Sequence, residues 1–290
     1  MDREDSQLFS NVVSIGQSTI TVRWRGPAAD VGQEGLYNWV DRSAAIVRGY
    51  YRQFPVKSVD VEVSTVDSDR MGSGRTFGYP RPRIEVTVGR HTSAQTLKDD
   101  WVLVHEMIHL ALPEVADAHT WLAEGIATYV EGVARTQAGN ISKTALWADY
   151  VKAIPQGLPR ENDRGLDRTH SWARTYWGGA LYCLIADVRI REQTNNRRGL
   201  QDALQAIAKL GAGMSSEWPV ERIFATGDAA TGTHVMTEIY DAMKDKPASP
   251  DLDALWADLG IQMIDGAIRL DDSSRLAAIR RAITHAADAG

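Results

Sequence analysis

The stretch HEMIH at residues 105–109, followed by WLAEG at residues 121–125, decides how this sequence is interpreted. His105 and His109 are four residues apart, so on a helix they lie on one face, one turn above the other. Both imidazoles can then reach one tetrahedral Zn²⁺. Glu106 follows His105 directly, in the position of a general base that acts on a metal-bound water. The pattern predicts a zinc site.

The residues around the motif argue against a chance spacing on a solvated helix. Apolar residues occur on nearly every side of it, which predicts a buried helix. They are Trp101, Val102, Leu103, Val104, Met107, Ile108, Leu110 and Leu112. Burying two histidines and a glutamate without partners costs several kcal/mol, and a bound metal would remove that cost.

Glu124, fifteen residues after His109, is the candidate third ligand. The segment 119–136 is predicted to be a second helix. Small residues, Ala123 and Gly125, flank Glu124 and permit close approach of another helix.

Other third ligands fit less well. The metzincin pattern needs His or Asp ten residues after the first histidine, and that position is Val115. Asp117 and His119 are nearer rivals to Glu124, but they lie in the connection between the two helices, where polar residues are expected anyway.

Composition and charge narrow the classes of protein. The 290 residues are 43% hydrophobic and 24% charged, which is typical of a folded globular chain. The net charge of −6 and the lack of a basic tract argue against nucleic acid as a partner. The apolar stretches are too short and interrupted to span a membrane. The length fits one large domain or two lobes.

Compartment and oligomeric state stay open. The single cysteine, Cys183, cannot form an intrachain disulfide, so it indicates no compartment. The charged residues 1–7 contain no apolar signal-peptide core. We expect a soluble protein, and export directed by a segment outside this sequence is the other option.

Apolar periodicity predicts an N-terminal α/β part and a mainly helical remainder. The metal helix is predicted to begin at Thr92 or Ser93 and to end at Pro113. The other predicted elements are strands at 19–24, 59–63 and 84–88, helices at 35–54, 200–210, 235–243, 252–259 and 271–286, and a strand-like segment at 261–270.

The segment 67–83 is rich in Gly, Arg and Pro and is predicted to be a solvated hairpin-type connection. It leads into the strand at 84–88, just before the metal helix. In zinc peptidases an edge strand beside the metal commonly holds the substrate backbone by strand addition. We assign that role to residues 84–88 as a hypothesis.

A long polar connection over 139–169, with a short helix near 147–151, is a candidate for the lining of a substrate cleft. After it, Tyr176 precedes two glycines and an apolar helix that continues to Ile190. A hydrolase needs a donor for the oxyanion of its tetrahedral intermediate, and Tyr, His or Arg can serve. From the residues alone, an isolated Tyr is more often a core aromatic, and His170 is a weaker candidate.

The chain resembles the gluzincins, zinc peptidases with an HExxH pair and a downstream glutamate. More narrowly, it resembles the glycyl aminopeptidase family and its uncharacterised bacterial relatives. The likeness covers about residues 95–285 and is carried by HEMIH at 105–109, WLAEGIATY at 121–129 and YWGGALYCLIADVRIREQT at 176–194. It implies that His105, His109 and Glu124 hold Zn²⁺, that Glu106 is the general base and that Tyr176 stabilises the transition state.

Three features of this chain depart from the family pattern. The gap from His109 to Glu124 is short for a gluzincin, so the connection must be tight. Four residues after Glu124, where thermolysin-like enzymes place an Asp behind a zinc histidine, this chain has Thr128. It also lacks the Gly-x-Met-Glu-Asn motif that helps other gluzincin aminopeptidases hold the substrate amine, so no residue supports aminopeptidase specificity.

The sequence therefore predicts an α+β fold of zincin-like, thermolysin-type architecture. Residues 1–93 form an N-terminal α/β lobe with a mixed sheet, and residues 94–290 form a helical lobe that carries the zinc site. The expected activity is zinc-dependent hydrolysis of peptide bonds, aminopeptidase-like in type, on a peptide or protein substrate. Two alternatives stay open: a non-catalytic peptide-binding protein on this scaffold, and a zinc hydrolase of a non-peptide bond.

Overall fold

The structure, a computed structural model, describes residues 9–211 and 213–285, and the chain divides into two compact units. Unit 1 comprises Met1–Glu114 and Gly211–Glu217, and unit 2 comprises Val115–Leu210 and Trp218–Gly290. A mixed N-terminal sheet followed by a helical remainder confirms the predicted α+β class. The helix with the HExxH motif lies in unit 1, with the sheet, whereas the sequence groups it with the helices after residue 93.

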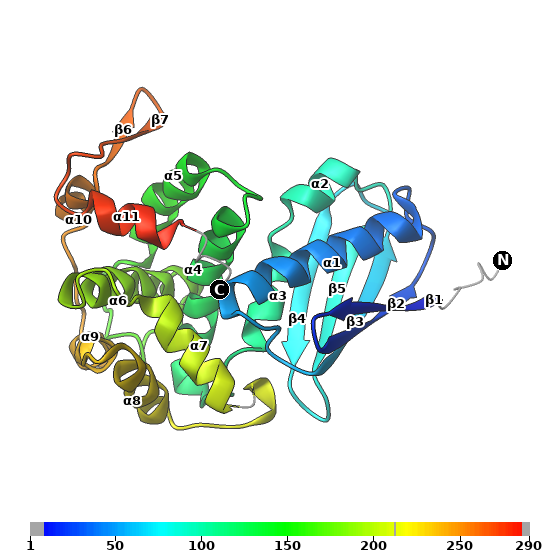
Figure 1. The fold of residues 1–290 in the computed structure, drawn as a ribbon, viewed down its shortest axis with the longest axis horizontal. Coiled ribbons are helices and arrows are strands. Elements are labelled where there is room, and N and C mark those ends of the chain that lie inside the picture. Colours follow the sequence, from blue (N-terminus) through cyan, green and yellow to red (C-terminus); the bar gives the residue numbers. More distant parts are fainter. Residues whose placement is uncertain (1–8, 212, 286–290) are drawn as a thin grey trace. The chain divides into compact units, whose positions relative to one another are not determined.

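Unit 1 is built on a five-stranded mixed sheet in the order β1-β2-β3-β5-β4 (Figure 1). The strands are β1 Phe9–Ile15, β2 Ser18–Arg25, β3 Ser58–Val66, β4 Met71–Phe77 and β5 Arg83–Gly89. The central strands β2, β3 and β5 are parallel, and β1 and β4 join the two edges antiparallel. Alternate residues of the central strands, such as Ile20, Val61 and Val86, are buried, as their period of two predicts.

Two expectations about the end of this sheet are wrong. The sequence predicts a connection over 67–83, but residues 71–77 form β4, an edge strand. Its glycines and polar residues lack the apolar alternation by which strands are identified, because the pattern of burial along β4 is irregular. The strand at 84–88 is β5, which is hydrogen-bonded to β3 on one side and β4 on the other. It therefore has no open edge for a substrate strand.

Three helices pack in unit 1: α1 Gly32–Tyr51, α2 Ala94–Asp99 and α3 Val102–His109. Figure 1 shows α1 crossing the strands on one face of the sheet. Its buried stripe includes Leu36, Val40 and Val47. α3, which carries the HExxH motif, contacts α1 and the edge strand β4. The motif is thus supported by the sheet and by the long helix.

The predicted single helix from Ser93 to Pro113 is broken in two. Ser93 caps α2, accepting a hydrogen bond from the Thr96 N–H, as the sequence indicates. Asp100 then interrupts the helix with extended backbone and starts α3. Its carboxylate accepts the N–H groups of Val102 and Leu103, at 3.1 Å each.

Asp100 is a sensitive point for the stability of α3. Besides capping the helix, its Oδ2 accepts the indole N–H of buried Trp39 at 3.0 Å. We expect Asp100→Ala to lower the free energy of unfolding by about 1–3 kcal/mol, because a cap and a buried hydrogen-bond partner are lost together. Urea denaturation measures this. The neighbouring Asp99 is exposed, and Asp99→Ala should change stability by less than about 0.5 kcal/mol. Equal effects of the two substitutions would contradict the capping role.

Unit 2 is helical apart from one hairpin. Its helices are α4 Thr120–Gln137, α5 Lys143–Ala153, α6 Gly179–Gln193, α7 Leu200–Gly211, α8 Val220–Thr231, α9 Val235–Met243, α10 Leu252–Leu259 and α11 Ala277–Ile283. The hairpin strands are β6 Ile261–Ile264 and β7 Ala267–Leu270. The predicted helix at 119–136 corresponds to α4, whose apolar stripe is buried and which packs on α6.

Several boundaries in unit 2 differ from the prediction. α8 has no counterpart among the predicted elements. The strand-like segment 261–270 is a hairpin because Asp265 and Gly266 both adopt positive φ, as a tight turn requires. The last helix begins at Ala277 rather than Asp271, since the Asp271 carboxylate instead holds a turn through Ser273 and Ser274. The predicted end of that helix, residue 286, lies outside the described residues.

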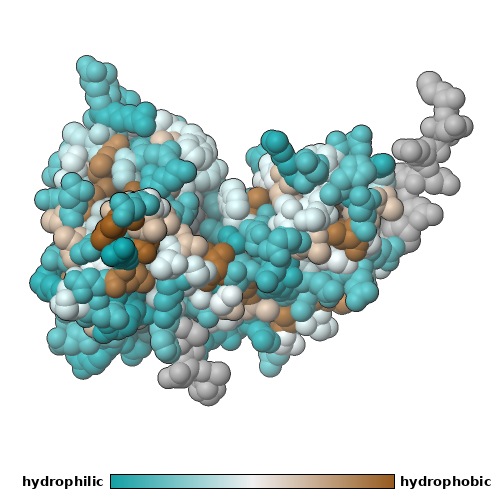
Figure 2. All heavy atoms as spheres, turned by 90° about the horizontal axis from the view of Figure 1, so that it is seen from above, coloured by the Kyte–Doolittle hydropathy of each residue, from teal (hydrophilic) through white to brown (hydrophobic). Residues whose placement is uncertain are grey.

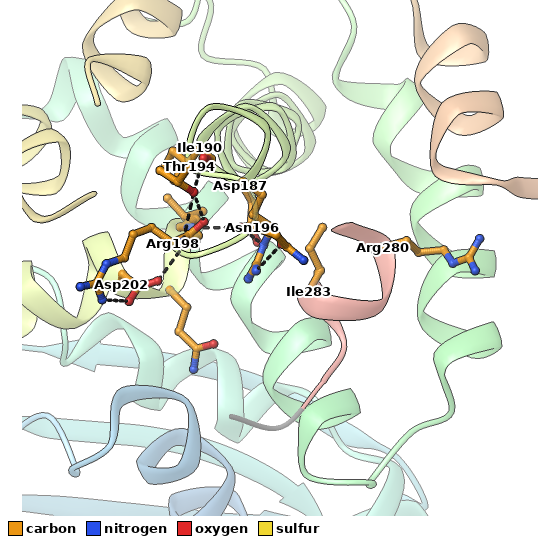
Figure 3. Close-up of polar contacts among 12 residues, drawn as sticks. Asp187, Ile190, Thr194, Asn196, Arg198, Asp202, Arg280 and Ile283 are labelled. Carbon is orange, nitrogen blue, oxygen red and sulfur yellow. Dashed lines mark hydrogen bonds and ion pairs between the residues drawn. The ribbon is translucent and has the colours of Figure 1, made fainter. Parts of the chain in front are cut away.

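Polar contacts hold the α6–α7 connection (Figure 3), and the aspartate at their centre is buried. Asp187 on α6, which is 2% exposed, accepts the Tyr129 hydroxyl of α4 at 2.9 Å and the Leu200 N–H of α7 at 2.9 Å. Arg191 donates to the same carboxylate at 2.8 Å. One aspartate therefore ties three helices together, α4 among them.

Hydrophilic residues cover most of the face drawn in Figure 2, and the hydrophobic residues there form small separate groups. Within 9–211 and 213–285, no helix has both the length and the apolar character needed to cross a membrane.

Candidate metal centre

The two histidines of the motif lie side by side on α3, as their spacing predicts. Their ring centroids are 4.9 Å apart with an interplanar angle of 80°. His105 is 5% exposed and His109 is half-buried, while the α3 residues between them are buried. The Trp101 ring packs edge-to-face against the His105 ring, with the ring centroids 5.7 Å apart. The two imidazoles, on adjacent turns, therefore lie next to each other at the C-terminal end of a buried helix.

Glu106 is held by the edge strand β4. The Thr76 hydroxyl oxygen lies 2.6 Å from Glu106 Oε2 and 2.9 Å from the Glu106 backbone oxygen. Gly74, two residues earlier, faces the same side chain, because a Cβ at position 74 would lie 2.5 Å from Glu106 Cγ. The Glu106 side chain is therefore confined by β4 on one side and by its own helix on the other.

Glu124 belongs to unit 2, where it is half-buried on α4. The next residue, Gly125, makes the close approach that its lack of a side chain predicts: a Cβ there would lie 2.3 Å from the Gly179 backbone. A Cβ on Gly179 would in turn lie 2.1 Å from the Trp121 carbonyl oxygen. The two glycines let α4 and the start of α6 touch through their backbones, directly beside Glu124.

Tyr176 lies on η3 Arg174–Gly178, a π-helical turn that leads into α6 and contacts α4. Single π turns inside α-helices often occur at functional sites. The Tyr176 ring stacks on Trp172 with centroids 5.5 Å apart, and Trp172 is 62% exposed. Within unit 2 the structure therefore places Glu124 and Tyr176 on two elements in contact.

A buried ion pair connects the π turn to the segment that precedes it. Arg174 Nε lies 3.0 Å from Asp163 Oδ2, with both side chains about 3% exposed. Arg174 Nη1 also donates to the Gly157 carbonyl oxygen at 2.6 Å. Burial lowers the pKa of the Arg174 guanidinium, and the Asp163 carboxylate opposes that shift. Gly157 and Asp163, in the connection before η3, thus hold the turn in position. The polar run 160–164 does not reveal this role in the sequence.

The start of α4 is fixed by Asp167. Its Oδ1 accepts the Trp121 indole N–H at 2.7 Å and lies 3.1 Å from His119 Nδ1. Its Oδ2 accepts the Tyr240 hydroxyl at 2.8 Å. Burial, and then this hydrogen bond, raise the pKa of Tyr240, so the phenol stays protonated as the donor. His119, a rival to Glu124 in the sequence, is thereby engaged with a carboxylate.

The other alternative residues show no comparable arrangement. Asp117 is exposed in the short 3₁₀ turn η1 Asp117–His119, and His170 is exposed just before η3. Thr128, one turn after Glu124, has a buried hydroxyl oxygen with no hydrogen-bond partner among the described residues. Sequence reasoning did not find Thr76 or Asp167. Both lie in segments without apolar periodicity, so only the fold reveals what they contact.

The donors on α3 fit zinc. Neutral imidazole nitrogens are ordinary zinc ligands, whereas Ca²⁺ and Mg²⁺ prefer sets of oxygen atoms. The two histidines are at positions i and i+4 and supply the nitrogen ligands. Glu106 is held by β4, so it is available as a base and is not needed as a third ligand. The residues present therefore suit a zinc ion bound at the His105 and His109 end of α3.

No family model matches the sequence, and neither does any curated protein. Solved structures do match. An aminopeptidase N family protein from Idiomarina loihiensis is 13% identical, with a TM-score of 0.66, over 88% of this chain and 49% of that one. A two-domain M1 zinc metallopeptidase variant bound to L-tryptophan is 17% identical with a TM-score of 0.55, over 85% and 53%.

A further match is an M1 zinc metallopeptidase variant from Deinococcus radiodurans bound to a Tyr-Ser-Ala substrate, 17% identical with a TM-score of 0.54. This chain spans about half the length of these proteins. At such identity the likeness shows a shared fold: the chain is folded like part of the M1 zinc metallopeptidases.

Proposed function

We propose that this protein is a zinc-dependent metallopeptidase of the gluzincin type, with a thermolysin-like zincin architecture. The observation that carries the proposal is the arrangement on α3, where His105 and His109 lie together and the Glu106 carboxylate is held by β4. The fold shared with M1 zinc metallopeptidases supports it.

In this proposal His105, His109 and Glu124 hold Zn²⁺. Support for Glu124 comes from its position after the HExxH motif and from the glycine contacts that fix α4 beside it. Zinc bound by such ligands acts as a Lewis acid and lowers the pKa of water toward about 7.

The chain's own residues then divide the work of hydrolysis. Glu106 accepts a proton from the attacking water and passes it to the leaving amine. Tyr176 donates its hydroxyl to the oxygen that gains charge in the transition state. Its ring is restrained by Trp172, and its turn by Arg174, so the donor is preorganised.

The substrate strand is proposed to pair with β4 instead of β5. β4 lies at the edge of the sheet, and it also contacts α3 and holds Glu106. An extended peptide added to that edge would run beside the Glu106 carboxylate, with main-chain hydrogen bonds supplying sequence-tolerant affinity.

Metal analysis with a substrate screen tests the proposal. The purified protein, loaded with equimolar Zn²⁺, is expected to retain about one zinc ion per chain and to cleave short unblocked peptides. N-acetylated peptides of the same sequence separate aminopeptidase from endopeptidase activity. Retained zinc with turnover of esters only would favour the hydrolase of a non-peptide bond. Zinc or peptide binding without any turnover would favour the non-catalytic scaffold.

Tyr176→Phe is expected to lower kcat by about 100-fold, which corresponds to ~3 kcal/mol for the loss of one oxyanion donor. Removing only the hydroxyl keeps the ring stacked on Trp172, so zinc content and thermal midpoint should match the parent. Tyr37→Phe, on α1, is the matched control. A Tyr176→Phe variant with parental kcat would remove Tyr176 from the mechanism.

A further inference from the structure

We propose that Thr76 is a positioning residue, which fixes one oxygen of the Glu106 carboxylate through its hydroxyl so that the other oxygen is available for proton transfer. The inference rests on the proposed function, because it concerns the base of that reaction. It adds a contribution from β4, a segment that the sequence presents as a simple connection.

The geometry of the contact identifies Thr76 as the donor. Oγ1 of Thr76 lies 2.6 Å from Glu106 Oε2, which is a short hydrogen bond between two oxygens. The hydroxyl has one proton, and the backbone oxygen of Glu106 at 2.9 Å is the weaker of its two acceptors. The proton therefore goes to the carboxylate.

The hydrogen bond matters because Glu106 has several rotatable bonds and only a narrow productive orientation. The residue Glu106 is 7% exposed, so little water competes with Thr76 for Oε2. A general base must reach its proton within hydrogen-bond distance, and partners that orient such groups commonly affect activity. Thr76 supplies this restraint from the neighbouring strand.

Gly74 leaves the space that the second oxygen needs. A Cβ at position 74 would lie 2.9 Å from Glu106 Oε1 and 2.5 Å from Cγ. Gly74 has no positive φ, so close approach rather than backbone conformation requires glycine here. Thr76 and Gly74 act on the two oxygens of one carboxylate: Thr76 binds Oε2, and the lack of a Cβ at Gly74 avoids a clash with Oε1.

The test compares Thr76→Val and Thr76→Ser in the full chain loaded with zinc. Valine keeps the shape and removes the donor, whereas serine keeps the donor. For Thr76→Val we expect kcat to fall on the order of 10- to 100-fold. KM should stay within about twofold, because the main-chain groups of β4 that are proposed to pair with the substrate are kept. Thr76→Ser should retain most of the parental kcat. Thr21→Val, at a half-buried threonine of β2 in the same sheet, is the matched control.

Crystal structures of the parent and Thr76→Val give a readout that does not depend on turnover. The Glu106 carboxylate should leave its position beside β4 in the valine variant, while zinc content stays equal. Gly74→Ala is the second variant: it keeps the Thr76 hydroxyl, displaces Glu106 by contact, and should also lower kcat.

The outcomes separate this inference from the proposed function. Parental kcat in Thr76→Val, or an unmoved Glu106 in its crystal structure, overturns the role of Thr76 alone. Equal losses in the valine and serine variants overturn it as well, because the hydroxyl would then not be the cause. A parent that binds zinc but cleaves no peptide overturns the proposed function and the inference together.

Discussion

Replacement of Glu106 by glutamine is expected to slow peptide hydrolysis strongly while the protein keeps its zinc. The amide has nearly the shape of the carboxylate but cannot accept the proton, so kcat should fall by about 10²- to 10⁴-fold, the range attributed to general acid–base catalysis. Zinc content should match the parent, because the proposed ligands are untouched. Peptide turnover and elemental analysis on the same preparation measure both quantities.

The control for this substitution is Glu85→Gln. Glu85 is an exposed residue of β5 in the same unit, and it pairs with Arg83 at the surface. It should change neither turnover nor zinc content. If Glu106→Gln hydrolyses peptides at the parental rate, Glu106 is not the base and the mechanism fails, whatever the metal content.

His109→Ala should release the metal. With one of the two adjacent imidazoles removed from α3, zinc affinity is expected to fall by more than about 100-fold, beyond the range for residues that only support a ligand. Elemental analysis after dialysis should then find little zinc. His91→Ala, an exposed histidine of the same unit, should keep it. Parental zinc content in His109→Ala would contradict the metal site.

The same assay decides the third ligand. Glu124→Gln is expected to lose zinc, whereas His119→Gln should retain it, because His119 is already engaged with Asp167. If His119→Gln loses zinc and Glu124→Gln retains it, the third zinc ligand is His119, in the connection between α3 and α4, and Glu124 is excluded.

Much of the local structure follows from residue patterns. Burial of one face requires apolar residues at a regular spacing, so the sequence predicts the strands β2, β3 and β5 by their period of two. For the same reason it predicts α1 and α4 by their helical apolar stripes. His105 and His109 are predicted to lie together for the same reason: their spacing of four residues fixes their geometry once the segment is helical.

The elements that the sequence does not reveal are those held by contacts distant along the chain. β4 has few apolar residues to mark it, and it is a strand because it pairs with β5. The expected long helix is broken at Asp100, whose carboxylate accepts a hydrogen bond from Trp39, far away in sequence. Likewise, the hydrogen-bond partner of Thr76 is Glu106, 30 residues away, and one partner of Asp167 is Trp121, 46 residues away.

The π turn of η3 has a consequence for how this chain tolerates changes in length. Its backbone bonds skip one residue more than those of an α-helix, so Arg174–Gly178 contains a residue that a regular helix would not need. Deleting one residue there would let the helix run unbroken into α6. Every side chain on the N-terminal side would then turn by about 100° around the axis. Such a deletion would change the direction of the Tyr176 hydroxyl and would take Arg174 away from Asp163, so the length of this one turn determines where the phenol points.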